Sequence, residues 1–406
     1  MNKNNTSLVP KIRFPEFTDD WEQRKLGEVF EEYSEKKHEE LPPLTIIQGG
    51  GTILREESDR ALQYDKNSLS GYKMVKKNDF IVHLRSFEGG LEKANSDGII
   101  SPAYHTFHGD NTDSRFYYPF FRSRRFIDVL LKPHVYGIRD GKSIDIEGMK
   151  TIMIPVPSYA EQKKIGEYIE SLDNLITLHQ RKLLTTKKLK KAMLQKMFPK
   201  NGCKVPEVRF KGFTDDWEQC KLSELSENIT VGIANSATHA YKKDGIVMFR
   251  NQNIKENYLD DSDVIFIDEE FEKKYVNKRL KANDLLVART GYPGTACVVP
   301  EKYQGSQTFT TLIARLKEGT NPFYACQYIN SDYGKKYFLA TQIGGGQKNS
   351  GAGILEDFPM ILPPTIEEQE RIADYLKHFD NLITLHQRKL DLYEKLKKGM
   401  LQKMFV

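Results

Sequence analysis

The sequence contains no run that approaches 18 consecutive apolar residues, the length that a membrane-spanning helix requires. The first ten residues are polar and lack an apolar core, so we expect neither a membrane span nor a secretory signal. Cysteine is scarce, and no two cysteines form a C-x-x-C pair; the four are Cys203, Cys220, Cys297 and Cys326. This usage disfavours a disulfide framework and a zinc ribbon, and it predicts a cytoplasmic protein.

The charge balance is close to neutral. The chain has 61 Lys and Arg against 56 Asp and Glu, a net charge of +5, and a pI of about 8.7. Nucleic-acid-binding domains usually exceed a pI of ~9, so charge alone favours an anionic partner without identifying it. Apolar residues make up 39% and aromatic residues 11% of 406 residues, which predicts two or three domains with packed cores.

The chain repeats itself. Residues 17–23 read FTDDWEQ and return at 213–219, whereas DNLITLHQRKL at 173–183 returns at 380–390. MLQKMF at 193–198 returns at 400–405. The offset grows from 196 to 207 residues along the repeat. The sequence is therefore a tandem duplication whose second copy is longer by 11 residues.

Each copy has a stub, a variable body and a strongly shared tail. We expect a stub at 1–23, body one at 24–158, a helix at 159–198, a linker with the second stub at 199–219, body two at 220–365, and a helix at 366–406. The bodies share a frame, because KNDFIV at 77–82 corresponds to ANDLLV at 282–287 and PLTII at 43–47 to GIVMF at 245–249. Short β-rich runs broken by Gly, Asn and Asp, with helical pieces near 116–131 and 322–341, predict a mixed α/β (α+β) globule for each body.

Both tails have the pattern of a coiled coil. Each follows a proline-marked boundary and then runs ~37 residues without proline. Apolar and matching polar residues recur in alternating steps of four and three. In the first tail these seam positions are Ile165, Ile169, Leu172, Ile176, His179, Leu183, Thr186, Lys190, Met193 and Met197, and in the second Ile372, Leu376, Phe379, Ile383, His386, Leu390, Tyr393, Lys397, Met400 and Met404. We predict two helices of about 55 Å that pair antiparallel with pseudo-two-fold symmetry and bring the C-terminus near body one. A histidine in such a seam is expected to pack rather than to bind metal.

Nine Lys and Arg, with no acidic residue, lie between residues 179 and 204. This segment is either a solvated helix face or a basic surface near phosphate or a partner subunit.

The sequence offers no recognisable catalytic motif. Residues 137–143 resemble a phosphate-binding loop but have one residue too few between the glycines, and the glycine-rich stretch at 344–353 has no strand before it. His105 and His108 lack further metal ligands nearby in the sequence. Asn321 followed by Pro322 is typical of a helix start.

Polar loops in both bodies are the best candidates for ligand contact. Arg and Lys read guanine, and Asn and Gln read adenine, in the major groove of DNA. For any one of these residues an ordinary polar turn is the better explanation, but their recurrence at matching places in the two bodies favours a paired binding surface. The candidates are Arg85, Ser86, His134, Tyr136, Arg139 and Lys142 in body one, and Arg250, Gln252, Asn253, Arg289, Thr290, Gln347, Lys348 and Asn349 in body two.

These features together resemble the specificity subunits of type I restriction–modification systems. The resemblance covers essentially the whole chain, although the bodies match only in outline. It rests on the stub Phe-Thr-Asp-Asp-Trp-Glu-Gln-x-Lys-Leu, on Ile154-Pro155-Val156-Pro157 with Glu161-Gln162, Ile165 and Leu172-Asp173, and on Leu362-Pro363-Pro364 with Glu368-Gln369, Ile372 and Phe379-Asp380.

The resemblance implies that each body is a target recognition domain that reads one half of a bipartite sequence in double-stranded DNA. The helices would set the spacer and dock two modification (methyltransferase) subunits, and restriction (motor–nuclease) subunits would join them. S-adenosylmethionine, Mg and ATP would be bound by these partners, and this chain would bind no cofactor and catalyse nothing itself. Two other functions fit the residues: a coiled-coil scaffold that binds only proteins, and a self-sufficient DNA enzyme whose cofactor motifs the sequence does not display.

Overall fold

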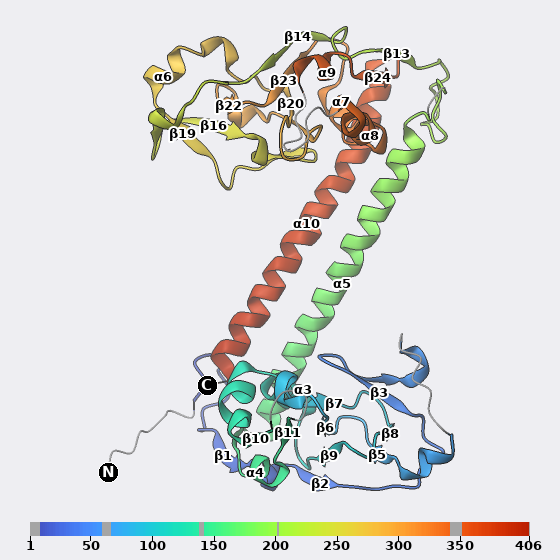
Figure 1. The fold of residues 1–406 in the computed structure, drawn as a ribbon, viewed down its shortest axis with the longest axis vertical. Coiled ribbons are helices and arrows are strands. Elements are labelled where there is room, and N and C mark those ends of the chain that lie inside the picture. Colours follow the sequence, from blue (N-terminus) through green and yellow to red (C-terminus); the bar gives the residue numbers. More distant parts are fainter. Residues whose placement is uncertain (1–8, 59–65, 138–141, 201–202, 342–350, 406) are drawn as a thin grey trace. The chain divides into compact units, whose positions relative to one another are not determined.

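A computed structural model of the chain describes residues 9–58, 66–137, 142–200, 203–341 and 351–405 (Figure 1). The chain divides into two compact units. Unit 1 comprises Met1–His179 and Lys389–Val406, and unit 2 comprises Gln180–Arg388. Each unit therefore holds one body together with part of each long helix. Along the described ranges, no helix combines the length and hydropathy needed to cross a membrane.

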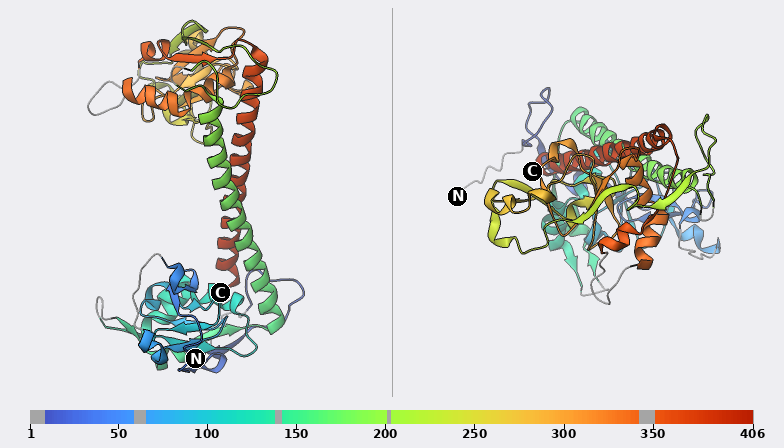
Figure 2. Two further views of the ribbon diagram at one scale, coloured as in Figure 1. Left: turned by 90° about the vertical axis from the view of Figure 1, so that its right-hand side faces the viewer. Right: turned by 90° about the horizontal axis from the view of Figure 1, so that it is seen from above.

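The two long helices are α5, Tyr159–Met197, and α10, Ile366–Met404, each of 39 residues. Within each unit a segment of α5 runs beside a segment of α10 (Figures 1 and 2). The predicted seam is confirmed, because every seam residue is buried or half-buried. The helices are antiparallel. In unit 1, Asp173 of α5 binds Lys397 of α10, and His179, further along α5, packs on Tyr393, which comes earlier in α10.

The seam contains one ion pair in each unit. Lys190 Nζ lies 2.5 Å from Asp380 Oδ1 in unit 2, and Lys397 Nζ lies 2.5 Å from Asp173 Oδ1 in unit 1. Lys190 and Lys397 are repeat partners, and so are Asp173 and Asp380. The seam lysine of each helix therefore binds an aspartate that directly follows a seam residue of the other helix.

Unit 1 begins with the strands and helices of body one. Its elements are β1 Glu22–Lys25, α1 Leu26–Val29, β2 Glu31–Tyr33, β3 Leu44–Ile47, β4 Gly51–Leu54, η1 Arg55–Glu57, η2 Lys66–Gly71, β5 Lys73–Val75, β6 Phe80–Val82, α2 Ser86–Gly89, β7 Glu92–Lys93, β8 Gly98–Ile100, β9 His105–His108, α3 Ser114–Phe121, the π-helix η3 Arg125–Leu131, η4 Lys132–His134, β10 Val135–Tyr136, β11 Ser143–Ile144, α4 Ile146–Lys150 and β12 Met153–Val156.

Unit 2 contains body two. Its elements are β13 Glu218–Lys221, β14 Ser226–Val231, η6 Thr238–Ala240, β15 Tyr241–Lys242, β16 Ile246–Arg250, η7 Asn251–Asn253, β17 Ile254–Lys255, β18 Tyr258–Leu259, β19 Ile265–Ile267, α6 Glu269–Lys273, η8 Val276–Lys278, β20 Leu285–Val287, β21 Ala296–Val298, η9 Glu301–Tyr303, β22 Gln307–Phe309, β23 Leu312–Leu316, α7 Pro322–Ile329, α8 Asp332–Thr341, α9 Ala352–Glu356 and β24 Pro359–Leu362.

The two bodies share one sheet topology. Body one has an antiparallel sheet in the order β2-β9-β6-β7, and body two has one in the order β14-β23-β20-β21. The strand that follows each stub pairs with the strand before each long helix, as β1 with β12 and β13 with β24. The mixed α/β fold expected from the repeat is therefore confirmed for both bodies.

A shared turn leads into the central strand of each sheet. Asn78 and Asn283 have φ angles of 77° and 69°, in the left-handed region that Asn tolerates better than most residues. The next residue is a buried carboxylate, Asp79 or Asp284, which closes the turn by accepting a backbone N–H. The repeated Asn-Asp of the sequence is thus a turn signal.

Each core is completed by a stub and by the end of the other repeat's helix. The stub residue Trp21 is buried in the core of unit 1, and Trp217 is buried in that of unit 2. Phe405, at the end of α10, packs on Phe116 in unit 1, and Phe198, at the end of α5, packs on the equivalent Tyr324 in unit 2. The prediction that the C-terminus returns to body one is confirmed.

The Glu-Gln pair at the start of each long helix ties three segments together. Glu161 binds Arg13 of the stub through two hydrogen bonds of 2.7 Å, and Glu368 binds Arg209 in the same way at 2.7 and 2.8 Å. Both glutamates are buried. A bidentate Arg–carboxylate pair holds both groups in one orientation, so the stub is fixed on the helix.

The glutamine that follows each glutamate connects the long helix to its body. Gln162 Oε1 accepts the backbone N–H of Asp113, the N-cap of α3, at 3.0 Å. Gln369 Oε1 accepts that of Asn321, the N-cap of α7, at 2.8 Å. Asn321 caps α7 with Pro322 in its first turn, as the sequence predicts.

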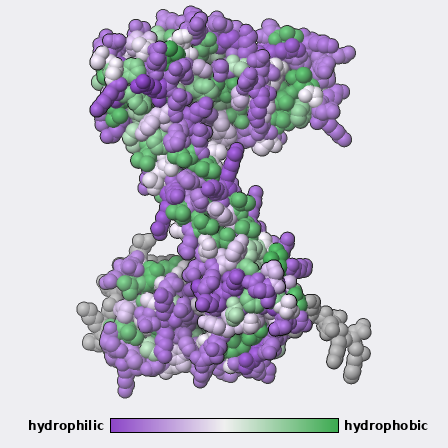
Figure 3. Space-filling view, turned by 180° about the vertical axis from the view of Figure 1, so that it is seen from behind, coloured by the Kyte–Doolittle hydropathy of each residue, from purple (hydrophilic) through white to green (hydrophobic). Residues whose placement is uncertain are grey.

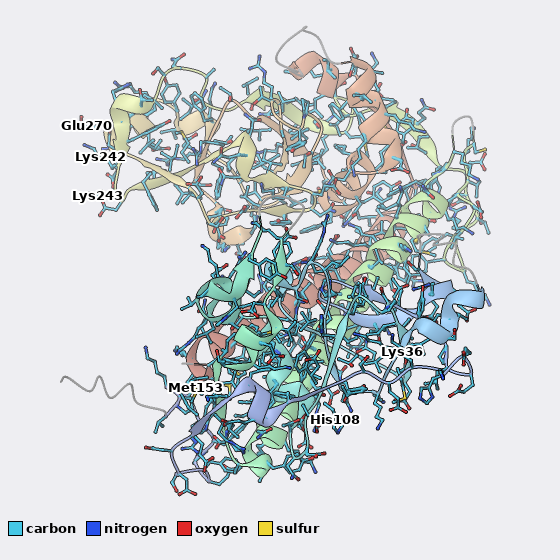
Figure 4. All side chains as sticks on the ribbon, turned by 60° about the horizontal axis from the view of Figure 1, so that its bottom comes forward. Lys36, His108, Met153, Lys242, Lys243 and Glu270 are labelled. Carbon is cyan, nitrogen blue, oxygen red and sulfur yellow. The ribbon has the colours of Figure 1, made fainter. Side chains whose placement is uncertain are left out.

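Body two carries a second sheet in the order β15-β19-β16-β22, in which β16 and β22 are parallel. Its outer strand β15 ends at Lys242, which Lys243 follows, and Figure 4 shows these lysines near Glu270 of α6 at one edge of the body.

Candidate nucleic-acid interface

Two loops occupy the same place in the two bodies. One connects β6 to β7, residues 83–91, and the other connects β20 to β21, residues 288–295. The registers agree, because Ile81 pairs with Glu92 and Leu286 pairs with Cys297. These hairpin loops contain the candidates Arg85, Ser86, Arg289 and Thr290, so the structure places both groups at equivalent ends of equivalent strands.

The first candidate segment of body one is a compact turn. Arg85 is exposed at the N-terminus of α2, and its backbone N–H donates to His83 Nδ1 at 3.3 Å. Ser86, in contrast, is fully buried, and its Oγ accepts the His83 N–H at 2.9 Å. The expectation that Ser86 contacts DNA is therefore corrected: this hydroxyl supports the loop that presents Arg85.

His83 titrates abnormally in this turn. Burial, with a smaller contribution from the nearby Arg122 guanidinium, lowers the pKa of His83 to about 4. The neutral ring is the form that can accept the Arg85 N–H at Nδ1. The loop is therefore held together by an uncharged histidine at neutral pH.

The second candidate segment of body one is the hairpin of β10 and β11. Tyr136 is exposed and His134 is half-buried, while Arg139 lies outside the described residues. Lys142 Nζ lies 5.7 Å from the ring centroid of Phe87 in α2. The structure thus brings this hairpin next to the loop of Arg85, as a shared surface requires.

In body two, Asn251 joins the two described candidate segments. Its Oδ1 accepts the N–H of Arg289 at 2.6 Å and lies 3.4 Å from the N–H of Thr290. Its Nδ2 donates to Thr310 Oγ1 at 3.1 Å. Sequence reasoning did not select Asn251, and the Arg-Asn-Gln-Asn run could not distinguish it from its neighbours. The candidates Gln347, Lys348 and Asn349 lie outside the described residues.

A carboxylate organises the first of these segments. Arg250 Nη2 and Gln252 Nε2 each lie 2.8 Å from Asp263 Oδ2. Asn253 is buried, and its Nδ2 donates to the carbonyls of Asp260 and Asp263. Asn253 is therefore a loop brace, which corrects its assignment as a base contact, whereas Gln252 is exposed beside Arg250.

Buried carboxylates fix the strands under these loops, each with a different partner. Asp79 binds His108, labelled in Figure 4, with 2.6 Å between Oδ1 and Nδ1. At the equivalent sheet position Asp284 binds Arg315, with 2.7 Å between Oδ2 and Nη2. Burial and the hydrogen bond to Asp79 raise the pKa of Tyr33 well above its usual range. The frame is conserved between the copies while the paired cation differs.

Within the ranges that the structure describes, no cluster of three or more His, Cys, Asp and Glu side chains could hold a metal ion. His179 and His386 lie in the helical seam, His179 buried against Tyr393 at a ring-centroid distance of 5.6 Å. His179 therefore packs against the other helix, as the sequence predicts.

The basic segment of α5 is partly neutralised within unit 2. Lys196 and Lys200 both bind Glu207, and Lys190 binds Asp380. Hydrophobic side chains also lie exposed on the helices amid hydrophilic ones (Figure 3). The exposed leucines of the two helices are Leu178, Leu184, Leu189, Leu385, Leu392 and Leu396.

The comparison with known proteins finds the same family model once in each repeat. The family model for the type I restriction modification DNA specificity domain matches residues 18–188 and 214–395. The type I restriction enzyme MjaVIII specificity subunit of Methanocaldococcus jannaschii is 26% identical over 273 residues, 64% of this chain and 62% of that protein. The match thus spans less than two thirds of that relative's length. The crystal structure of a type I restriction-modification system S subunit from M. genitalium has the same fold, with a TM-score of 0.63, 13% identity, and coverage of 98% of this chain and 99% of that one.

Proposed function

Because the chain belongs to the type I restriction modification DNA specificity domain family, we propose that it is the DNA specificity subunit of a type I restriction–modification complex. Body one reads one half of a bipartite target in double-stranded DNA, and body two reads the other half. One observation supports this most directly. Sheets of the same strand order present different side chains at equivalent hairpin loops, as expected of two modules that read unlike half-sites.

The long helices set the distance between the half-sites. A helix rises 1.5 Å per residue, and seam packing with an ion pair in each unit stabilises the paired helices. The half-site spacing then follows from helix length, as it does in other proteins that bind two half-sites through a fixed scaffold. The loops that read bases differ between the bodies, so the target is asymmetric in sequence.

The helices also offer two equivalent docking surfaces. Leu178 and Leu396 are exposed in unit 1, and their repeat partners Leu385 and Leu189 are exposed in unit 2. Each unit therefore presents one leucine from α5 and one from α10 at matching positions. Apolar side chains on paired helices suit a protein partner, and the duplication suits two identical modification subunits.

The chain itself is non-catalytic on this proposal. S-adenosylmethionine is bound by the modification subunits, which methylate adenine N6, and Mg and ATP are used by the restriction subunits that cleave DNA. The complex acts in the cytoplasm, in keeping with the four free cysteines. This chain contributes two binding surfaces, the loops for DNA and the helices for protein partners.

The methylome tests the proposal. DNA from cells with and without this gene, both expressing the modification subunit, is compared by single-molecule sequencing. We expect one bipartite N6-methyladenine motif to disappear on deletion and to return on complementation. Unchanged methylation, together with co-purification of the chain and an active modification subunit, would contradict the proposal.

A further inference from the structure

The two equivalent hairpin loops each expose one large apolar side chain. Tyr292 in the β20–β21 loop is 84% exposed, and Leu84 in the β6–β7 loop is 66% exposed. Among large hydrophobic side chains of the described residues, these are the two highest exposed fractions. An isolated exposed leucine needs no explanation. An exposed apolar side chain at the equivalent hairpin of two diverged bodies does need an explanation, because the shared sheet does not require one there.

The loop that carries Tyr292 is ordered by its own hydrogen bonds. Ala288 N–H donates to the Thr295 carbonyl at 2.8 Å, and Gly294 N–H donates to the Ala288 carbonyl at 3.0 Å. Tyr292 N–H donates to the Thr290 carbonyl at 3.0 Å, across Gly291 at φ 77°. A β-carbon at residue 291 would meet no atom within 4 Å, so glycine is required there for the backbone angle and not for space.

The loop that carries Leu84 is ordered by different bonds. Ser86 N–H donates to the His83 carbonyl at 3.0 Å, and Gly90 N–H donates to the Ser86 carbonyl at 2.8 Å. With the side-chain bonds of His83 and Ser86, the backbone on either side of Leu84 is fixed. Two unrelated networks therefore give the same result, a rigid loop that presents one apolar side chain to solvent.

An apolar side chain on an ordered loop is preorganised for binding. Its backbone is already ordered, so little conformational entropy is lost when a partner covers it. Proteins that bend duplex DNA insert apolar wedges between base steps and partly unstack them. Aromatic side chains also stack on base faces where those are exposed, as in single strands. Arg85 is the immediate neighbour of Leu84, and Thr290 lies two residues before Tyr292, so polar groups for phosphate and base edges accompany each wedge.

We propose that Leu84 and Tyr292 are paired wedges, one for each half-site, that insert at a base step of double-stranded DNA and kink it. This inference rests on the proposed function and deepens it, because it assigns the residues that deform the target. Pyrimidine–purine steps unstack most easily. The wedge therefore adds sequence preference at a step that no hydrogen bond reads.

The experiment uses the complex of the full chain with its modification subunits and a duplex that carries the methylome-defined target. Dyes at the two duplex ends report bending by energy transfer, and 2-aminopurine placed within either half-site reports unstacking. Variants Tyr292→Ala and Leu84→Ala are compared with the conservative Tyr292→Phe and Leu84→Met. Tyr258→Ala and Val129→Ala are matched controls, since these side chains are also exposed, at 57% and 62%, and lie outside both loops.

We expect each alanine variant to lower target affinity ~10-fold, from the usual value of one stacked base or wedge, and to reduce bending and the 2-aminopurine signal in its own half-site only. The conservative variants retain both signals, and the controls stay within ~2-fold of wild type. Substitution of such exposed side chains seldom affects folding.

Three outcomes overturn the inference. Unchanged bending and affinity in both alanine variants would show that no wedge inserts. Unchanged DNA binding with weakened co-elution of the modification subunits would assign Leu84 and Tyr292 to a protein interface. Wild-type complex without target-specific binding would refute the proposed function itself, and this result is distinguishable because it precedes any substitution.

Discussion

The ammonium of Lys377 on α10 lies 4.2 Å from the ring centroid of Phe323 on α7. At the equivalent place in the first repeat, Arg115 Nη1 of α3 lies 3.2 Å from Glu170 Oε2 of α5. The helix residue and the body residue have thus both changed between the copies, from an ion pair to a cation–π contact. Each body is therefore matched to its own helix at this contact.

This match predicts a coupled substitution. Glu170→Lys places a like charge beside Arg115 and should destabilise unit 1 by about 1 kcal/mol. When all variants also carry Asp113→Asn, so that no buried carboxylate loses its Arg115 partner, adding Arg115→Phe should recover about half of that, because it recreates the contact seen in unit 2 beside the neutral cap Asn321. Thermal unfolding of the single and double variants measures the coupling. Simple additivity of the two substitutions would show that the two positions do not interact.

The seam ion pairs should differ in their contribution to stability. The side chains of Lys190 and Asp380 are 10% and 26% exposed, whereas those of Lys397 and Asp173 are 28% and 48% exposed. Asp380→Asn leaves a largely buried lysine unpaired and should cost about 3 kcal/mol. Asp173→Asn should cost less than about 1 kcal/mol. Native-state hydrogen exchange across α5 measures both, and equal losses would contradict this dependence on burial.

Acid should weaken unit 1 through His83. The pKa of this histidine is about 4 in the folded chain and near 6.5 in the unfolded chain. Between these values the unfolded chain binds the additional proton, so stability falls as the pH decreases from about 6.5 to 4. His83→Gln should remove this component of the pH dependence of thermal unfolding. As a control, His38→Gln should not remove it, because hydrogen bonds to Glu40 and Glu35 raise the pKa of His38.

Substitutions in the two bodies should affect different half-sites of the target. Arg85→Ala should lower the affinity for the target ~5–100-fold by removing discrimination in the half-site that body one reads. Arg289→Ala should do the same in the half-site that body two reads, since this is the usual range for a lost base contact. Competition with duplexes altered in one half-site at a time measures the assignment. A uniform loss over all sequences, with a reduced salt dependence, would instead identify these arginines as phosphate contacts.

Helix length should control the spacer. A seven-residue insertion preserves the four-three alternation of the seam and adds ~10 Å. Inserted in both α5 and α10, it should lengthen the unspecified spacer by about three base pairs while both half-sites stay the same. Methylome sequencing reads the new motif directly. A spacer of the original length, with methylation retained, would contradict the proposal that helix length sets the spacing of the half-sites.

The parts of the molecule that sequence reasoning predicted depend on local periodicity. The seam from Ile165 to Met197 could be read from its spacing alone, because helix geometry places those residues on one face. The Asn-Asp turns and the Asn321 cap were readable because each uses the hydrogen-bonding habits of one or two residues. The duplication was visible as identity between distant segments.

The role of individual polar residues could not be read in this way. Ser86 and Asn253 look like surface contacts in the sequence, yet both are buried and hold backbone atoms. Asn251 braces two loops that are distant in sequence. The polar type of a residue says that it will form hydrogen bonds, but only the folded chain decides whether the partner is its own backbone or a ligand.

The sequence by itself therefore determined that this protein is a tandem repeat with two bodies and two seam-forming helices, because repetition and periodicity are properties of order along the chain. The tertiary structure decided which helix end fills which core, which carboxylate pairs with which cation, and that Leu84 and Tyr292 stand on equivalent hairpins. Those relationships join residues far apart in sequence, and they arise only when packing brings such residues together.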